Sequence, residues 1–316
     1  MARRRGILVI VVLVVAWGST FAAVKVGVAG SPPVLFAGLR SLVGGAAMAT
    51  LAAFRRGGPR VRGNAGVYTL LTVLNVIGFF GLQTLAIWEL PSGLAAVLIY
   101  LQPVMTGVLA APLLGERLGV NKIAGLLLAF SGIVVVSAGA VTGQVSGPGV
   151  AYAVGSALVW ALGTIAFKHT QGRVDPWWAV ALPFLVGGGV LTVAGVVGEG
   201  ARVHWSWPFA AALVYASLVG TALAWALWFA LVGSGEASRA STYIFFVPLV
   251  SLLIGALFLD EHIGPSLLAG SAAVVAGVSL VNRATRQDPG VRRGPASSHE
   301  PQETPQRSYL GGSERA

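Results

Sequence analysis

The chain of 316 residues contains no cysteine, and charged residues make up only 10% of it. The absence of cysteine excludes disulfides and thiolate metal sites. Soluble globular domains carry about 25% charged residues, so the shortage of charge argues against that class. In contrast, 55% of the residues are hydrophobic and 43 are glycine, which is typical of membrane helices. The composition predicts an integral membrane protein in contact with the lipid bilayer.

Acidic residues are also missing from the middle of every long apolar stretch. The four histidines lie at stretch ends, in loops or near the C-terminus, without metal-ligand spacing. An intramembrane enzyme needs an acid, base, nucleophile or metal inside its spans. We therefore expect no catalytic residue, no metal and no cofactor. A carboxylate relay for protons is not expected either, so exchange or facilitated diffusion stays open beside proton antiport.

Long apolar stretches predict ten transmembrane helices, since about 20 apolar residues cross a bilayer as a helix. We read the first stretch as a retained helix and not as a signal peptide, because its apolar run continues to about Val28. The predicted spans are 7–28, 32–54, 66–88, 93–114, 122–140, 149–169, 177–198, 207–231, 237–259 and 265–283.

Positive charge predicts the orientation of these spans. With the N-terminus inside, the inner segments and the tail hold 18 Lys and Arg, whereas the outer loops hold only Arg202. Positive residues accumulate on the cytoplasmic side of membrane proteins. Both termini are thus expected in the cytoplasm of a multi-pass protein of the cell (inner) membrane. Although the net charge is +10, the sequence contains no stripe of basic residues interleaved with aromatic residues. We therefore expect no nucleic-acid partner.

The chain contains an internal repeat. Residues Ala95–Ser137 align without gaps with Ala240–Asn282, 145 residues later, and 11 of the 43 positions are identical. The stretch "PLLGERLG" (112–119) is thereby matched by "LFLDEHIG" (257–264), and "WGSTFAAVK" (17–25) resembles "WALGTIAFK" (160–168). Because five helices per repeat is an odd number, the second copy must have the opposite orientation. We predict an all-α membrane fold of ten transmembrane helices, arranged as two inverted five-helix repeats around a central cavity.

The predicted units are a first repeat at 1–142, a second, inverted repeat at 143–283 and a disordered cytoplasmic tail at 284–316. "AWGSTF" (16–21), the ends "GERLG" and "DEHIG", and "AGLLLAFSGIVVVS" (124–137) resemble the EamA-type family of the drug/metabolite transporter superfamily. The resemblance covers residues 1–283. It implies a bundle with a cavity lined mainly by helices 1, 3, 4, 6, 8 and 9. It also implies export of amino acids, related metabolites or other small molecules.

Polar and aromatic groups within spans are candidates for this cavity, because they are costly in lipid. Proline can expose backbone carbonyls beside them. Alternatively, the tryptophans do not face the cavity and only fill space against lipid or a neighbouring helix. The substrate-binding candidates are Trp17, Asn75, Gln83, Tyr100, Gln102, Trp160, Thr164, Trp225 and Tyr243.

A second set of residues is expected to act in structure or as hinges. Arg40 is placed there, with a substrate carboxylate as its alternative partner. The two glutamates are expected to tie helix ends to neighbouring loops, and the prolines to bend helices. The set consists of Arg40, Pro103, Pro248, Glu116 and Glu261.

The function predicted from all these features is secondary transport of a small-molecule solute, with export of amino acids or related metabolites by alternating access. Carriers of drug-like compounds or of lipid- or nucleotide-linked sugars remain alternatives. Two alternatives belong to other functional classes: an intramembrane enzyme, and a helical bundle with a purely structural or sensory role. Glycine-rich and alanine-rich stretches such as 38–47 and 187–195 permit close helix packing and leave a homodimer possible.

Overall fold

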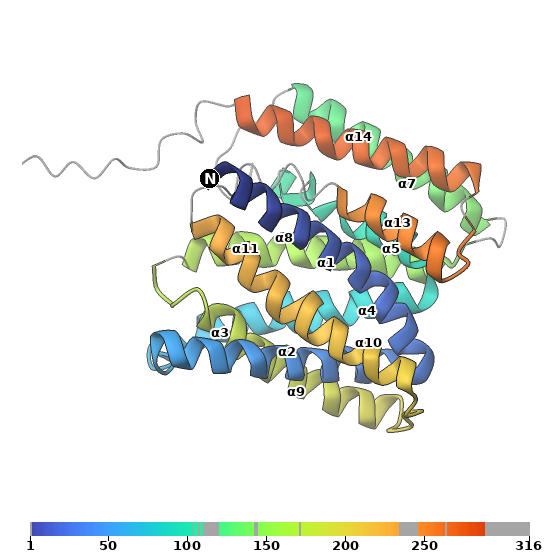
Figure 1. Ribbon diagram of the computed structural model, residues 1–316. Coiled ribbons are helices and arrows are strands. Elements are labelled where there is room, and N and C mark those ends of the chain that lie inside the picture. Colours follow the sequence, from blue (N-terminus) through green and yellow to red (C-terminus); the bar gives the residue numbers. More distant parts are fainter. Residues whose placement is uncertain are drawn as a thin grey trace, which may run out of the picture.

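The computed structural model describes residues 2–102, 104–106, 108–109, 120–141, 145–170, 172–233, 246–262 and 264–287. Within these ranges every regular element is a helix (Figure 1). The first part of the chain contains α1 (Ala2–Gly30), α2 (Pro33–Arg56), α3 (Ala65–Leu71), η1 (Thr72–Gly78), α4 (Phe79–Glu89), α5 (Ser92–Ile99) and α7 (Val120–Val141). The second part contains α8 (Gly147–Thr170), α9 (Trp178–Gly198), α10 (Trp207–Ser217), η2 (Leu218–Leu223), α11 (Ala224–Gly233), α13 (Phe246–Phe258) and α14 (Pro265–Gln287).

Six helical segments are long and apolar enough to cross a membrane. They are Leu8–Gly30, Pro33–Arg56, Ala65–Glu89, Gly147–Phe167, Trp178–Gly198 and Trp207–Trp228. Four shorter apolar helices lie where the remaining spans are predicted: Ser92–Thr106, Ile123–Gly132, Phe246–Phe258 and Pro265–Gly277. The molecule is therefore a helical, multi-pass membrane protein, and the count of ten stays a prediction.

Local sequence explains how the long helices begin and end. Helix α2 starts with Pro33 after Pro32, because a proline in the first turn gives up no helical hydrogen bond. Its last turn carries Arg55 and Arg56, and it stops at Gly57 with φ of 72°, a left-handed conformation suited to glycine. Helix α10 starts at the N-cap Ser206, whose side chain accepts a hydrogen bond from the Phe209 N–H.

Two π-helical segments interrupt the spans that contain α3–α4 and α10–α11. Shifted by 145 residues, η1 would cover 217–223, and η2 covers 218–223. The same local irregularity thus occurs at the same place in the two aligned parts of the chain. Because π-helical segments are frequent at functional sites, the space between η1 and η2 is a candidate site.

Corresponding helices pack against each other in opposite directions. Helices α7 and α14 lie side by side along one edge of the bundle, and α2 and α9 lie along the opposite edge (Figure 1). In the α2–α9 pair, Gly38 approaches Thr192 and Gly45 approaches Leu185. From the first contact to the second, the residue number increases in α2 and decreases in α9. The two helices are therefore antiparallel. Contacts of Gly132 with Gly270 and of Gly277 with Gly125 give the same direction for α7 and α14.

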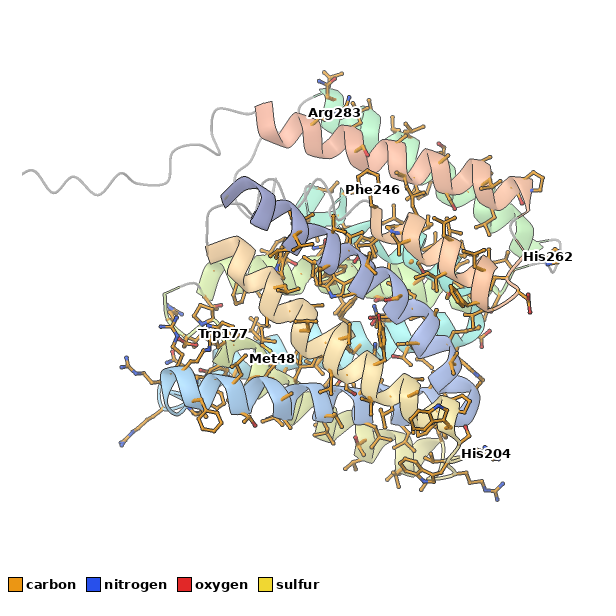
Figure 2. The ribbon with its side chains drawn as sticks, in the orientation of Figure 1. Met48, Trp177, His204, Phe246, His262 and Arg283 are labelled. Carbon is orange, nitrogen blue, oxygen red and sulfur yellow. The ribbon has the colours of Figure 1, made fainter. Side chains whose placement is uncertain are left out.

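Connections at one end of the bundle contact one another. Figure 2 shows His204 and His262 at this end and Trp177 at the opposite end. The contacts join Gly30 with His204, Val34 with Glu199, Lys25 with Leu90, Glu89 with Ser146, and Ser92 with Glu261. These are the connections that the charge distribution assigns to the outer side.

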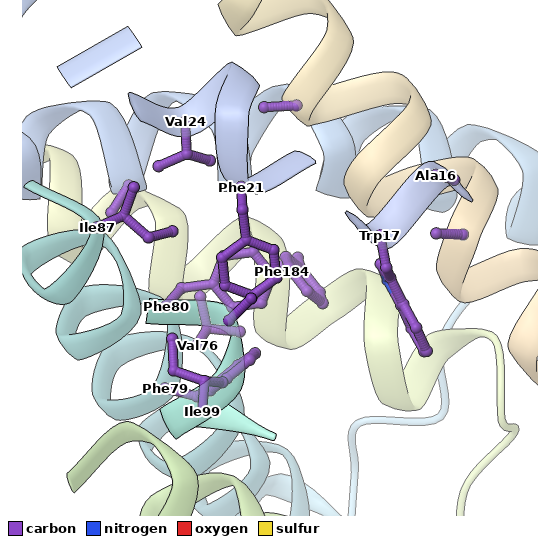
Figure 3. Packing of buried hydrophobic residues seen from close by; sticks show 14 of the residues in the cluster. Ala16, Trp17, Phe21, Val24, Val76, Phe79, Phe80, Ile87, Ile99 and Phe184 are labelled. Carbon is purple, nitrogen blue, oxygen red and sulfur yellow. The ribbon is translucent and has the colours of Figure 1, made fainter. Parts of the chain in front are cut away.

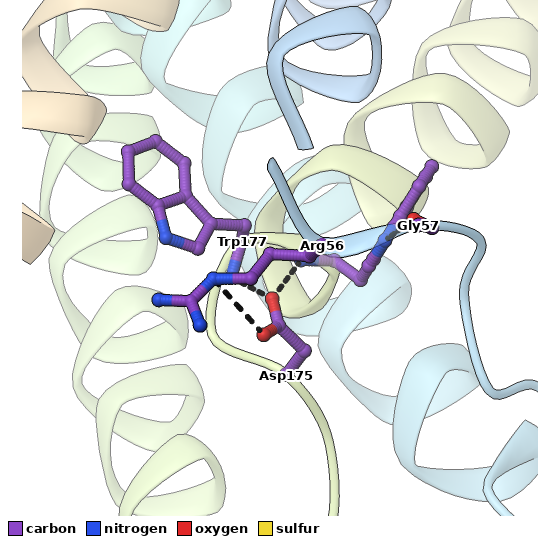
Figure 4. A network of polar contacts seen from close by, with 5 residues as sticks. Arg56, Gly57, Asp175 and Trp177 are labelled. Carbon is purple, nitrogen blue, oxygen red and sulfur yellow. Dashed lines mark hydrogen bonds and ion pairs between the residues drawn. The ribbon is translucent and has the colours of Figure 1, made fainter. Parts of the chain in front are cut away.

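The opposite end holds the arginine-rich connection 55–64. Its Arg56 Nε lies 3.9 Å from Asp175 Oδ2, and the Trp177 N–H donates to Asp175 Oδ1 at 2.9 Å (Figure 4). The indole N–H of Trp178 donates to the Gly57 carbonyl at 2.8 Å. Among the described residues, the connection 55–64 and the connection that contains Arg173 and Asp175 therefore lie together at this end of the bundle.

Candidate functional site

A small cavity lies where α1, α2, α4, α8 and the η2–α11 segment meet. The space open to the centre of a water molecule is about 30 Å³, enough for about two waters and too small for an amino acid. In this conformation the cavity therefore has no room for such a solute. Its lining consists of Trp17, Thr20, Phe21, Arg40, Phe79, Phe80, Gln83, Tyr100, Trp160, Gly220 and Trp225.

Aromatic rings form most of the cavity wall. Trp160 stacks on Phe79 with ring centroids 4.8 Å apart and meets Tyr100 edge-on at 5.7 Å. Trp17 meets Trp225 edge-on at 6.1 Å. Figure 3 shows Phe21, Phe79 and Phe80 gathered on one side, with Trp17 facing them from the other. Such walls offer flat apolar and cation–π surfaces to a solute.

The helices cross closely beside this cavity at two matching points. Gly220 of η2 lies against the Thr20 side chain of α1, and Gly163 of α8 lies against the Asn75 side chain of η1. In each crossing the glycine has no side chain and leaves room for a polar side chain of the partner helix. Small residues at such crossings allow membrane helices to approach each other closely. Thr20 and Gly220 line the cavity, whereas Asn75 lies in the other crossing and is not part of the lining.

Among the described residues, Arg40 is the only charged one in the lining. Its side chain is 1% exposed. Its Nη2 donates to Gln83 Oε1 at 2.7 Å and to Thr84 Oγ1 at 3.0 Å. The guanidinium carbon lies 4.4 Å from the centre of the Phe80 ring, which is cation–π geometry. Helices α2 and α4 thus place a positive charge at the aromatic wall.

Tyr100 reaches the cavity because α5 ends just before it. The Leu101 N–H bonds to the Leu98 carbonyl at 3.2 Å instead of continuing the α-helical pattern, and helical residues resume at Gln102. The expected continuous helix over 93–114 is therefore interrupted here. Pro103 follows in the sequence, and a proline has no N–H to donate to the preceding turn.

Gln102 and Thr164 lie together beside Tyr100. The side-chain amide of Gln102 donates to Thr164 Oγ1 and to Thr106 Oγ1, each at 3.0 Å. The three polar side chains thus satisfy one another between α8 and the segment that follows α5. They are adjacent to the cavity and do not line it.

The turn between α4 and α5 is held by two charged side chains from distant parts of the chain. Lys25 Nζ donates to the carbonyls of Ile87, Trp88 and Leu90 at 2.8–3.0 Å. Glu261 accepts from the Ser92 N–H at 2.6 Å and from the Gly93 N–H at 3.3 Å. Cation and anion thereby cap the C-terminus of α4 and the N-terminus of α5, in agreement with the helix dipole.

Several predicted residues do not take part in this geometry. Pro103, Glu116 and Tyr243, together with residues 288–316 of the predicted tail, lie outside the described residues. Pro248 is buried in the first turn of α13. Across the described ranges, no three His, Asp or Glu side chains come together as a metal site would need.

Known proteins resemble the chain over nearly its whole length. The model of the EamA-like transporter family matches it twice, at residues 4–138 and 147–283. The chain belongs to the EamA-like transporter family. This family is part of the drug/metabolite transporter superfamily, so the molecule is a membrane transporter of small-molecule solutes and not an enzyme.

Individual relatives of this EamA-like transporter cover similar lengths. The chain is 40% identical over 283 residues to "Uncharacterized transporter YvbV" of Bacillus subtilis (strain 168), covering 89% of this chain and 93% of the relative. It is 31% identical to a "Probable amino-acid metabolite efflux pump" of Salmonella typhimurium, covering 89% and 95%. It is 30% identical to a "Probable terminal-alkyne amino-acid exporter" of Streptantibioticus cattleyicolor, covering 90% and 96%.

One solved crystal structure is similar in fold. It superimposes with a TM-score of 0.63 at 19% sequence identity and covers 90% of this chain and 100% of its own. At this identity the likeness concerns the fold alone. The helical arrangement of this transporter therefore occurs in an experimentally determined structure.

The cavity of this EamA-like transporter brings together part of the predicted set. Trp17, Gln83, Tyr100, Trp160 and Trp225 line it. Sequence reasoning missed Thr20, Phe21, Phe79, Phe80 and Gly220. A signal existed for Phe80, because it lies 145 residues before Trp225 and so occupies the equivalent position of the repeat.

Proposed function

We propose that this EamA-like transporter is a secondary transporter that exports amino acids or related small metabolites across the cell membrane by alternating access. In this proposal ten transmembrane helices form two inverted five-helix halves, with both termini in the cytoplasm. The first half is the predicted unit 1–142 and the second half is the predicted unit 143–283, and the family model matches one segment in each, 4–138 and 147–283. Substrate binds in the aromatic cavity between the halves.

The observation that carries the proposal is the antiparallel packing of corresponding helices. In a parallel duplication, equivalent helices would run in the same direction. The opposite directions of α2 and α9, and of α7 and α14, support an inverted duplication. Transporters of this architecture bind their substrate between the repeats. The lining by Trp17 and Trp160, which match in the two halves, supports a substrate site at the pseudo-two-fold axis.

For a solute to pass, the small cavity must widen and open to one side of the membrane at a time. Lys25 and Glu261 bind the same turn, 89–93, from α1 and from the end of α13. Release of these contacts would free the outer ends of α4 and α5. We therefore assign the closure of the outer side to this pair.

The substrate class is supported by two relatives, because both are named for export of amino acids or their metabolites. The aromatic wall suits a solute with an apolar body.

Counterflow in proteoliposomes tests the proposal. Vesicles containing the full chain are preloaded with mixed unlabelled amino acids, and the uptake of labelled amino acids is followed with and without a pH gradient. We expect transient accumulation of at least one amino acid, absent from protein-free vesicles. A change with the gradient would identify proton coupling. Correctly inserted protein that accumulates no amino acid would refute the amino-acid assignment and direct attention to drug-like or sugar-linked solutes.

A further inference from the structure

Arg40 is a buried cation whose hydrogen-bonding capacity is only partly used. A guanidinium has five N–H donors. The structure gives this one two hydrogen bonds, both from Nη2, to Gln83 and Thr84. Its Nε is buried without a partner. Arg40 is part of the cavity lining, so a guanidinium with unused donors borders the place where a solute would bind.

No carboxylate of the described residues neutralises Arg40. Three of the five are bound at helix ends: Glu89 to Ser146, Glu199 to Val34 and Glu261 to Ser92. Asp175 pairs with Arg56, and Asp260 is exposed in a connection. A buried charge without a counter-ion is strongly unfavourable, and charged groups inside membrane proteins mark substrate pathways.

The two neighbours of Arg40 orient its charge and do not cancel it. Thr84 uses its proton to donate to the Phe80 carbonyl at 2.8 Å, so its oxygen is free to accept from Nη2. Gln83 offers a neutral carbonyl oxygen. The Phe80 ring covers one face of the guanidinium. A positioned, positively charged fork of this kind matches the geometry of a carboxylate.

We propose that Arg40 is the anion-binding residue of the cavity and that it binds the carboxylate of the transported solute. The apolar body of the solute then packs against Phe79, Trp160 and Trp225. No described residue of opposite charge faces a solute ammonium group in the lining. Recognition therefore depends more on the carboxylate than on the amine, which has only the aromatic faces of the wall to bind. This inference rests on the proposed function and narrows its substrate class to monocarboxylates with an apolar body, amino acids among them.

The polar cluster of Arg40, Gln83 and Thr84 lies entirely in the first half of the chain. The two sides of the cavity therefore differ in polarity. The positions 145 residues after Arg40, Gln83 and Thr84 hold Leu185, Trp228 and Phe229. A solute bound through Arg40 thus has one polar pole and an apolar remainder. The same orientation would persist while the two halves exchange the open side.

Binding to the purified full chain in detergent tests the inference without requiring transport. The probes share one body: L-phenylalanine, 3-phenylpropionate, which lacks the amine, and L-phenylalaninamide, which lacks the carboxylate. Ligand-dependent thermal stabilisation gives their apparent affinities. We expect both acids to bind and the amide to bind at least about tenfold more weakly, as for loss of a charge-assisted hydrogen bond. Equal binding of acid and amide, or no binding of either acid, would overturn the inference.

Variants connect the effect to the side chain. Arg40→Gln should abolish the preference for acid over amide, Arg40→Lys should retain part of it, and Thr84→Val should weaken it. The control Arg202→Gln removes an exposed arginine and should leave the preference unchanged. The comparison of probes on the unaltered chain decides the matter even if Arg40→Gln does not fold.

The outcome is distinguishable from that of the counterflow experiment. Acid-selective binding that depends on Arg40, without counterflow of any amino acid, would support the anion site and count against amino-acid export. Counterflow that amides inhibit as strongly as acids would support export and overturn the role of Arg40.

Discussion

The Arg40 cluster in α2 and α4 and the corresponding region of α9 and α11 have similar backbones and opposite chemistry. Helices α2 and α9 begin 145 residues apart, and the π-helical segments occur at nearly the same offset. Yet Arg40, Gln83 and Thr84 correspond to Leu185, Trp228 and Phe229. The comparison teaches that the repeat preserves the helix arrangement, while the polar chemistry of the cavity belongs to one half. In the proposed mechanism, the symmetry of the repeat serves the movement of the two halves, and the asymmetry of the cavity serves recognition of the solute.

The largest effect should come from disturbing the α2–α9 contact, on which both halves depend. A Cβ at Gly188 would lie 2.7 Å from the Leu42 backbone nitrogen, whereas a Cβ at Gly189 would meet no atom within 4 Å. Gly188→Val should therefore lower the free energy of unfolding by about 3 kcal/mol, as overpacking does. Thermal unfolding in detergent measures this, with Gly189→Val as the matched control. Equal melting temperatures for the two variants would contradict the close packing of these helices.

A smaller loss is expected when the turn 89–93 loses its anionic cap. Glu261→Gln keeps the shape of the side chain but removes its negative charge. The carboxylate that accepts hydrogen bonds from the Ser92 and Gly93 N–H groups is thereby replaced by a neutral amide. We expect a loss of about 1–2 kcal/mol in the free energy of unfolding. We also expect faster exchange of the amide protons at the start of α5, which hydrogen-exchange mass spectrometry detects. His262→Gln, at an exposed neighbour, is the control. Unchanged exchange at Ser92 and Gly93 would argue against this closure of the outer side.

The tryptophans test whether the halves contribute equally to the cavity wall. Trp17 and Trp160 occupy matching positions and both line the cavity. Replacing either by leucine removes aromatic contacts worth about 0.5–1.5 kcal/mol, so solute affinity should fall about threefold to tenfold in each variant. Counterflow over a range of solute concentrations measures this. Trp207→Leu, at an 83% exposed tryptophan, should have no effect. A loss for one of the pair alone would show that the wall is as asymmetric as the Arg40 cluster.

Orientation can be tested with no expected effect on transport. The chain has no cysteine, so each single cysteine substitution introduces the only thiol. A membrane-impermeant maleimide should label Arg202→Cys in intact cells and Arg60→Cys only after permeabilisation, because positive charge is retained inside. Both positions are exposed. Labelling of Arg60→Cys from outside would reverse the proposed orientation.

Sequence by itself determined the membrane class, the position of the six long helices, the repeat and the family. These properties depend on local apolar length and on residues compared along the chain. The six helices that qualify as spans coincide with predicted spans to within a few residues, as α9 at Trp178–Gly198 illustrates for 177–198. The contact between the predicted outer connections, such as Glu261 with Ser92, agrees with their assignment to one side.

Only the tertiary structure decided which polar side chains share a cavity. In a helix that is apolar on all faces, hydrophobic periodicity does not indicate the inward face. Asn75 and Gln83 were equivalent candidates in sequence, yet Asn75 lies against Gly163 at a helix crossing and Gln83 binds Arg40 in the cavity. Likewise, Arg40 was expected in a structural role, and its place among Phe80, Gln83 and Thr84 depends on how α2 packs on α4. Apolar residues direct a helix into the bilayer, but contacts between helices decide which side chains meet.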